Sequence, residues 1–229
     1  MKKSILVSMA VAAAALSMNA QTEGAKPANS GYFGIRASGT LTCPSSWKSW
    51  NRYYDDDGET KFKKGGGLSI GMIYHAPITR SFYIEPGVSL YYNATGIKHP
   101  WNSDYTSSMR ESGMLFPVML GFQFDATKDV NMQVFYGPEL RVGFSNEIYE
   151  TYKGRVNSET EHESQYRHDA SHRMNRVNCD LRFGVGFNIS RKYYVGISGV
   201  VGLSNAAYEK YDNSFHQNHV DFTIGYNFR

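Results

Sequence analysis

Five large aromatic side chains with the chemistry of a binding surface stand in two polar stretches of the chain, residues 43–65 and 93–112. Trp and Tyr rings combine a wide apolar area with a polar group, and they dominate the energetics of many binding surfaces. In the first stretch, three consecutive aspartates follow the rings. The candidates for surface binding are Trp47, Trp50, Tyr53, Tyr54 and Trp101. We expect them to contact a carbohydrate or a protein.

A second candidate group consists of charged residues of both signs, each of which stands between apolar neighbours. Its members are Arg36, Glu85, Glu139, Arg141, Asp180, Arg182 and Asp221. If these segments are strands, the charged side chains project from the face opposite the apolar face of each strand. An isolated buried charge costs several kcal/mol. We therefore expect a network of ion pairs and hydrogen bonds, the alternative being a proton or small-ion path along the same groups.

The polar stretch 145–176 contains three histidines, His162, His168 and His172, among acidic residues. Imidazole and carboxylate groups suit a divalent metal, but their spacing here matches no recognised site. The DDDG sequence at 55–58 also lacks the alternating ligands of an EF-hand loop. We predict no metal site and no cofactor.

The elements that would position these residues are strands, because the chain repeatedly alternates apolar and polar residues. The final stretch, VDFTIGYNFR, shows this pattern most strictly, since successive side chains of a strand leave opposite faces. The same period of two recurs upstream. The eight predicted strands are residues 31–42, 66–76, 82–92, 113–124, 130–144, 177–188, 193–203 and 220–228.

Short and long connections between these segments alternate without exception. The short ones are residues 77–81, 125–129 and 189–192, and the long polar ones are 43–65, 93–112, 145–176 and 204–219. Every short turn therefore lies on one rim and every long loop on the other, as in outer-membrane barrels with periplasmic turns and extracellular loops. The sequence predicts an all-β fold, an eight-stranded antiparallel transmembrane β-barrel with up-and-down meander topology over residues 31–229.

Aromatic residues near the short-turn rim agree with this barrel. In such barrels, aromatic girdles gather where the apolar band meets the lipid headgroups. The predicted periplasmic girdle consists of Phe33, Tyr74, Phe82, Phe122, Phe124, Phe187, Tyr193, Tyr226 and Phe228. A soluble sandwich or lipocalin-like barrel would explain the alternation but not rings at one height on the outer face.

The first 20 residues have the features of a secretory signal peptide. Lys2 and Lys3 precede an apolar run from Ile5 to Leu16, and Ala20 stands at the expected cleavage point. The run is too short for a membrane-spanning helix. We expect cleavage of residues 1–20, a short periplasmic segment over 21–30, and location of the mature chain in the cell outer membrane.

The composition of the chain limits the classes of partner and of fold that it allows. The net charge is only +3 and the basic residues are dispersed, which argues against nucleic acid. The mean hydropathy of −0.46 fits a barrel with one apolar face. Cys179 falls on the predicted strand 177–188, and Cys43 begins the loop that follows the strand 31–42. These two strands are not neighbours, so we expect the thiols to lie far apart and to form no disulfide.

Several strand motifs resemble the outer-membrane β-barrel family of Bacteroidetes, often labelled porin-family or PorT-like, which includes small OmpX-like barrels. The motifs are IEPGVSLYYNATG, MLFPVMLGFQF, FYGPELRVGF, DLRFGVGFNI and FTIGYNFR. The resemblance implies an outer-membrane barrel, and most members have no assigned activity. The final strand, ending at Phe228 before Arg229, also resembles the segment that the outer-membrane assembly machinery recognises.

We therefore expect a small outer-membrane protein whose barrel anchors surface loops that bind an extracellular ligand or protein. Outer-membrane lipid and lipopolysaccharide are its other expected partners, and the loop aromatics could instead touch lipopolysaccharide. The interior of eight strands is only just filled by side chains, so a narrow channel for small solutes or ions is the alternative. A lipid-modifying enzyme is the second alternative, but inward-facing His75 has no outward serine neighbour, and we predict no enzyme.

Overall fold

A computed structural model describes residues 31–44, 61–98, 105–156, 160–169, 175–206 and 216–229. These ranges hold ten strands, and no helix among them is long and apolar enough to cross a membrane. The barrel strands are β1 (Tyr32–Thr42), β3 (Gly65–Pro77), β4 (Phe82–Lys98), β5 (Tyr105–Asp125), β6 (Val130–Val156), β8 (Val177–Ile189), β9 (Tyr193–Gly202) and β10 (His219–Phe228). Two further strands, β2 (Lys61–Phe62) and β7 (Thr160–Asp169), lie outside the barrel. The predicted signal peptide and periplasmic segment, residues 1–30, fall outside the described ranges.

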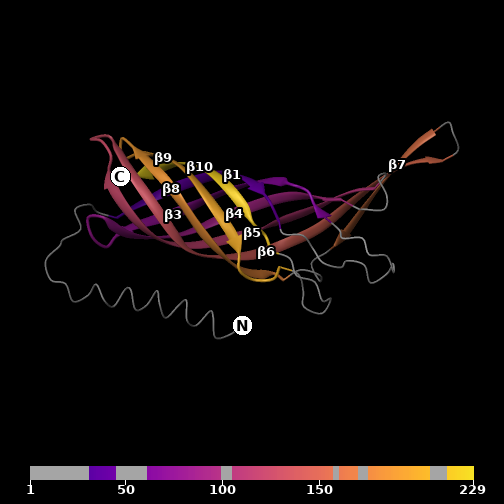
Figure 1. The fold of residues 1–229 in the computed structure, drawn as a ribbon, viewed down its shortest axis with the longest axis horizontal. Coiled ribbons are helices and arrows are strands. Elements are labelled where there is room, and N and C mark those ends of the chain that lie inside the picture. The colour runs from indigo at the N-terminus through magenta and orange to yellow at the C-terminus, as the bar shows by residue number, and fades with distance from the viewer. Residues whose placement is uncertain (1–30, 45–60, 99–104, 157–159, 170–174, 207–215) are drawn as a thin grey trace.

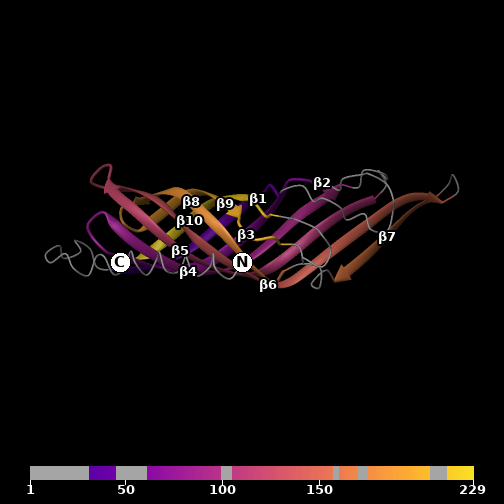
Figure 2. The ribbon, with the colours of Figure 1, turned by 60° about the horizontal axis from the view of Figure 1, so that its bottom comes forward.

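The eight barrel strands close on themselves in an antiparallel sheet (Figures 1 and 2). Their order is β4-β3-β1-β10-β9-β8-β6-β5, and the pairing of β5 with β4 completes the ring. The first and last strands pair along their whole length, from Phe33 opposite Phe228 to Thr42 opposite His219. The predicted eight-stranded barrel is confirmed.

Apolar side chains cover the outside of this barrel. Leu68, Tyr136 and Ile224 are 69%, 61% and 64% exposed, and most other large apolar residues on the same face are exposed as well. A continuous apolar surface of this extent is unfavourable in water but is what a lipid bilayer requires of a barrel. The strict alternation of the final strand therefore separates a lipid-facing side from an interior side.

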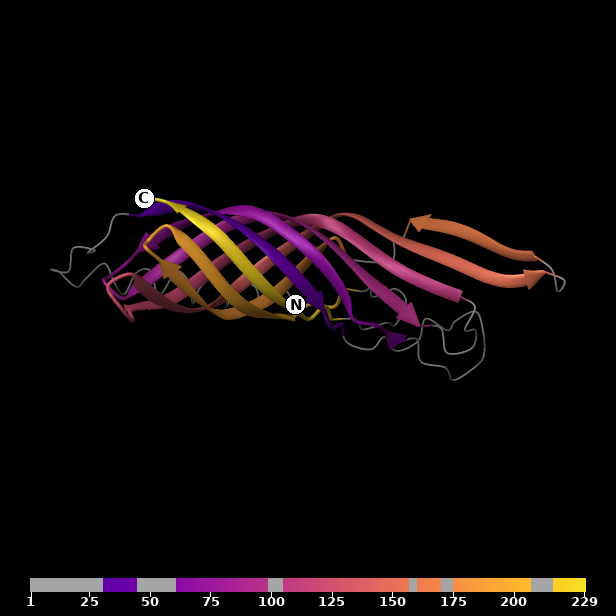
Figure 3. The ribbon, with the colours of Figure 1, turned by 90° about the horizontal axis from the view of Figure 1, so that it is seen from above.

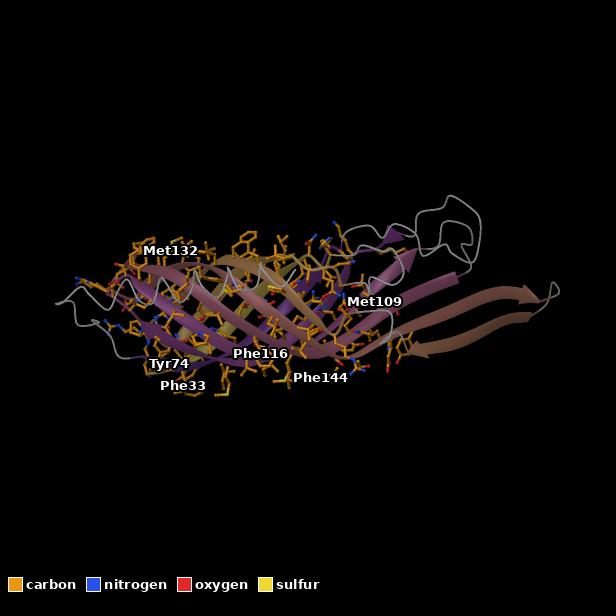
Figure 4. All side chains as sticks on the ribbon, turned by 90° about the horizontal axis from the view of Figure 1, so that it is seen from below. Phe33, Tyr74, Met109, Phe116, Met132 and Phe144 are labelled. Atoms are coloured by element: carbon orange, nitrogen blue, oxygen red, sulfur yellow. The ribbon has the colours of Figure 1, made fainter. Side chains whose placement is uncertain are left out.

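The residues predicted as a periplasmic girdle lie on this outer face near the short turns. Phe33 and Tyr74 are neighbours across β1 and β3, with ring centroids 4.8 Å apart (Figure 4). Similar ring contacts join Phe82 to Phe122 at 5.2 Å and Tyr193 to Tyr226 at 5.8 Å. The rings thus follow the rim from strand to strand.

Two of the long connections are mostly strand, where the sequence indicated loops. β4 continues to Lys98 and β5 begins at Tyr105, while β6 runs to Val156 and pairs with β7. The alternation ends earlier because these extensions hold only isolated apolar residues, such as Met109, among polar ones. Backbone pairing does not require an apolar face. The continuation also passes a β-bulge at Ser112 and Gly113, where the register to β6 shifts.

The extensions form an open sheet that projects beyond the barrel on the side opposite the C-terminus (Figures 1 and 3). Its strand order is β2-β4-β5-β6-β7. β6 has 27 residues, against 10 in β10, and at about 3.3 Å per residue it is roughly 90 Å long. We call this projecting sheet, formed by β2, β7 and the outer parts of β4, β5 and β6, the arm.

Candidate functional site

The interior of the barrel is the chemically richest part of the described chain. Inward positions alternate with lipid-facing ones along each strand. The side chains of the charged residues identified in the sequence all point into the barrel. Six of the seven lie in β1, β6, β8 and β10, and the seventh, Glu85, lies in β4. Asp180 is fully buried, and Glu139, Arg141 and Asp221 are 1% to 2% exposed.

Arg182 on β8 is the centre of this interior network. Its Nε and Nη2 donate to the two carboxylate oxygens of Glu139 on β6, at 2.7 and 3.1 Å. Its Nη1 donates to Asp221 on β10 at 2.7 Å and to Ser198 on β9 at 2.9 Å. One guanidinium therefore ties four strands together, with the two-pronged carboxylate geometry that makes Arg pairs strong.

Asp221 carries the network onward to the strand that closes the barrel. Thr40 on β1 donates its hydroxyl to Asp221 Oδ1 at 2.7 Å. His219 Nε2 lies 3.6 Å from Asp221 Oδ2. The first and last barrel strands, β1 and β10, are thus joined by side chains inside the barrel as well as by backbone pairing.

A second group of charges lies towards the outer end of the barrel. Arg141 Nη2 is 3.2 Å from Asp180, and its Nη1 is 4.0 Å from Glu111. Gln217, which precedes β10, donates its amide to the other oxygen of Glu111. These contacts link β5, β6 and β8 to the chain entering β10.

Near the periplasmic end, aromatic contacts accompany the charges. His75 Nδ1 lies 3.1 Å from Glu85, and the His75 ring stacks between Tyr32 and Tyr83 with centroids 4.6 and 4.3 Å away. His75 is 2% exposed. This packing directs the imidazole inward and away from lipid.

Arg36 differs from the expectation of an ion pair. Its guanidinium carbon lies 4.1 Å from the centre of the Tyr194 ring, and its Nη1 donates to the carbonyl of Ile35 at 3.2 Å. Cation–π contact of this kind stabilises a desolvated guanidinium. A Cβ atom at Gly225 would come 2.7 Å from the Arg36 side chain, so this glycine leaves the space that Arg36 occupies.

The wall formed by β4 and β5 is less charged. Tyr83, Tyr91, Leu115 and Met119 point inward there and are 2% to 7% exposed. Met109 lies further out on β5 and is 2% exposed (Figure 4). Most of the charged interior residues therefore lie on β1, β6, β8 and β10, while β4 and β5 contribute mainly tyrosine, leucine and methionine side chains beside Glu85 and Glu111.

The interior of an eight-stranded barrel is just wide enough for its own side chains to fill it. A water-filled pore of this strand number would need small side chains in the interior, whereas the ion pairs of Arg182 with Glu139 and Asp221 lie there. The arrangement suits a closed, internally cross-linked anchor.

Two network members were not anticipated from the sequence. Glu111 was assigned to a loop because the apolar alternation ends at Gly113, and Gln217 stands in a stretch without alternation. The signal that could have identified Glu111 is its parity: it is two residues from Gly113 and four from Leu115, both inward. Continuing the period past the apolar residues would have placed it inside.

The predicted surface-binding residues fall outside the described ranges. Four of them lie within 45–60 and Trp101 lies within 99–104, between the ends of β4 and β5. Of the loop histidines, His162 and His168 belong to β7, and His172 is outside the described ranges. In the described part of the chain, no group of three or more His, Cys, Asp and Glu residues could hold a metal ion.

A closed antiparallel barrel with an apolar outer band, an aromatic rim and an ion-paired interior defines a small outer-membrane β-barrel protein. The model of the outer membrane protein beta-barrel domain family matches residues 19–208, and the chain belongs to this family. The protein is accordingly located in the outer membrane. Among curated proteins, none matches the sequence.

Several solved barrels are similar in structure over most of their length. OprG of Pseudomonas aeruginosa is 10% identical with a TM-score of 0.44, covering 90% of this chain and all of its own. Ail of Yersinia pestis, solved in complex with a heparin analogue, is 12% identical with a TM-score of 0.41, covering 87% and 100%. Neisserial surface protein A is 9% identical with a TM-score of 0.42, covering 86% and 97%.

Proposed function

We propose that the protein is an envelope anchor whose extracellular arm binds a ligand or protein at the cell surface. The observation that carries the proposal is the arm itself: strands of the barrel continue without interruption into a sheet that projects from the long-loop rim (Figure 3). Such a sheet holds loop residues away from the membrane on a hydrogen-bonded support. The aromatic-rich stretches 45–60 and 99–104 connect directly to strands of this sheet, β2, β4 and β5.

Binding by intact cells that display the mature protein tests this proposal. Retention on immobilised mucin, sulfated glycosaminoglycan and collagen would be compared between the wild type and a variant with Trp47, Trp50 and Trp101 changed to Ala. The proposal predicts retention on at least one of these polymers that falls at least tenfold in the variant. Retention that is equal for wild type, variant and cells lacking the protein would contradict it.

The channel and enzyme alternatives have less support. The interior ion pairs around Arg182 occupy the space through which a solute would pass. The enzyme alternative needed an outward catalytic histidine at a rim, but His75 is buried against Tyr32 and Tyr83. We infer that the protein is not an enzyme.

We further propose that β10 is the segment by which the outer-membrane assembly machinery selects this chain. Its support is that β10 carries the exposed aromatic residues Tyr226 and Phe228 and pairs with β1 to close the barrel. The strand motifs place the chain, in our proposal, within the PorT-like barrels of Bacteroidetes.

A further inference from the structure

Residues 216–218, which lead into β10, lie outside the strand ladder but are held against the outer rim of the barrel. The backbone N–H of Cys43, just after β1, donates to the Asn218 carbonyl at 2.8 Å. The N–H of Gly202 on β9 donates to Asn218 Oδ1 at 3.1 Å. His216 Nδ1 lies 3.1 Å from the carbonyl oxygen of Gly202. A few hydrogen bonds therefore fix the position of this segment between β1 and β9.

The glycine at the end of β9 lets this segment approach the barrel closely. A Cβ atom at Gly202 would lie 2.8 Å from the backbone nitrogen of Gln217 and 2.9 Å from its carbonyl oxygen. These distances are shorter than real Cβ atoms make, so any larger residue at position 202 would push the segment away. The backbone of Gln217 rests directly on β9, and the residue is only 8% exposed.

The side chain of Gln217 crosses the outer mouth of the barrel. Its amide donates to the carboxylate of Glu111 on β5. In the closed ring, β10 and β5 lie on opposite sides, with β9, β8 and β6 between them in one direction and β1, β3 and β4 in the other. A contact between these two walls must span the interior. Glu111 has the same parity as Met109, which marks the outer end of the interior in Figure 4.

The contact between Gln217 and Glu111 adjoins the outer group of interior charges. Glu111 is 6% exposed, and its second carboxylate oxygen lies 4.0 Å from Arg141. Arg141 is closer to Asp180, at 3.2 Å. A buried carboxylate is costly unless it is paired or hydrogen-bonded. Because Arg141 is shared between two carboxylates, the amide of Gln217 gives Glu111 the close hydrogen-bond partner that it needs.

We propose that residues 216–218 form a latch that closes the outer mouth of the barrel over its interior charges. Gln217 fastens the latch to Glu111. The latch opens without loss of the barrel, because residues 216–218 are not part of the strand ladder. The network around Arg182 lies deeper, so an open latch admits water as far as Arg141 without creating a continuous pore. This device is independent of whatever the arm binds.

Thiol labelling from the outside tests the latch. In the full chain carrying C43S/C179S, Val200→Cys is the reporter, because Val200 is 2% exposed and lies two residues further into the barrel than Gly202. A membrane-impermeant methanethiosulfonate reagent is added to intact cells. We expect labelling to be slow with the latch intact and roughly tenfold faster or more in Gln217→Ala, which loses a hydrogen bond to a carboxylate. The matched control, Gln123→Ala, removes a buried amide near the periplasmic end and should leave the rate unchanged.

An exchange of the two side chains tests their direct contact. Gln217→Glu places a second carboxylate against Glu111 and should speed labelling, whereas E111Q/Q217E restores one donor and one acceptor and should return the rate towards that of the intact latch. Fast labelling of the reporter with the latch intact would overturn the proposal, because the mouth would then be open. Equal rates in Gln217→Ala and Gln123→Ala, or failure of the exchange to slow labelling, would also overturn it. Unboiled mobility in SDS verifies that each variant is folded.

Discussion

At the scale of single residues, Arg182 does the most to hold the barrel interior together. Its guanidinium meets Glu139 and Asp221 from strands on either side, with the shortest contacts at 2.7 Å. Glu139 and Asp221 are almost completely buried. Without Arg182, both carboxylates would be buried with neither a cation nor enough water to solvate them.

Changing Arg182 to Met should therefore lower the free energy of unfolding by about 3–5 kcal/mol, the usual cost of breaking a buried ion pair. Reversible denaturant titration of the protein in lipid vesicles measures this. Lys192→Met removes an exposed cation on a periplasmic turn and should change stability by no more than about 0.5 kcal/mol. Equal effects of the two substitutions would show that the interior pairs contribute nothing.

The turn between β8 and β9 offers a gain of stability. Ser190 and Arg191 have φ of 51° and 61°, and Lys192 N–H donates to the Ile189 carbonyl at 3.1 Å. This two-residue turn with positive φ favours Asn-Gly. Combining Ser190→Asn with Arg191→Gly should raise the free energy of unfolding by about 1 kcal/mol or more. Ser190→Val should lower it, and the opposite order of stabilities in denaturant titration would refute the assignment.

For the charged residues, the sequence predicted which face each side chain occupies but not which partner it contacts. Charges between apolar neighbours indicated inward positions, because alternation fixes the face. Their partners could not be predicted, since pairing depends on how adjacent strands are staggered. Arg36 shows this: a carboxylate partner was expected, and the ring of Tyr194 lies over its guanidinium instead.

At the scale of elements, the arm is the feature that alternation did not reveal. β5 and β6 pair from Asp125 opposite Asn131 out to Tyr105 opposite Tyr152. Their outer halves hold only isolated apolar residues, such as Met109 opposite Ile148, so the apolar period that locates a membrane strand is absent. The boundary predicted at Gly113 marks the point where β5 leaves the apolar band.

The β6–β7 hairpin should be dispensable for folding, because within the described chain β7 pairs with β6 alone. Glu147 and Asp169 are directly opposite each other, so an Asn-Gly turn can replace residues 148–168. The shortened protein should still migrate faster in SDS when unboiled, as closed barrels do. Deletion of residues 219–228, which form β10, should abolish that mobility shift; loss of the shift in the hairpin deletion as well would show that the arm is part of the folding unit.

At the scale of the whole molecule, the fold was predictable because two independent patterns agree. The apolar–polar alternation predicted the number of barrel strands. The regular succession of short and long connections predicted the direction in which each strand runs. The girdle then followed, as the contact of Phe33 with Tyr74 illustrates. The ligand was not predictable, because neither pattern carries information on the stretches between the strands, such as residues 99–104 with Trp101.

The whole molecule combines a closed barrel with an arm that projects from one rim. The closed interior distinguishes the proposed anchor from the channel alternative. Planar-bilayer conductance of the refolded mature protein tests most directly whether the interior is closed. We predict no stable single-channel currents from the wild type, because Arg182, Glu139 and Asp221 bridge the interior. Stable currents from the wild type whose conductance changes in Arg182→Met would contradict the account and identify the interior network as the lining of a narrow channel.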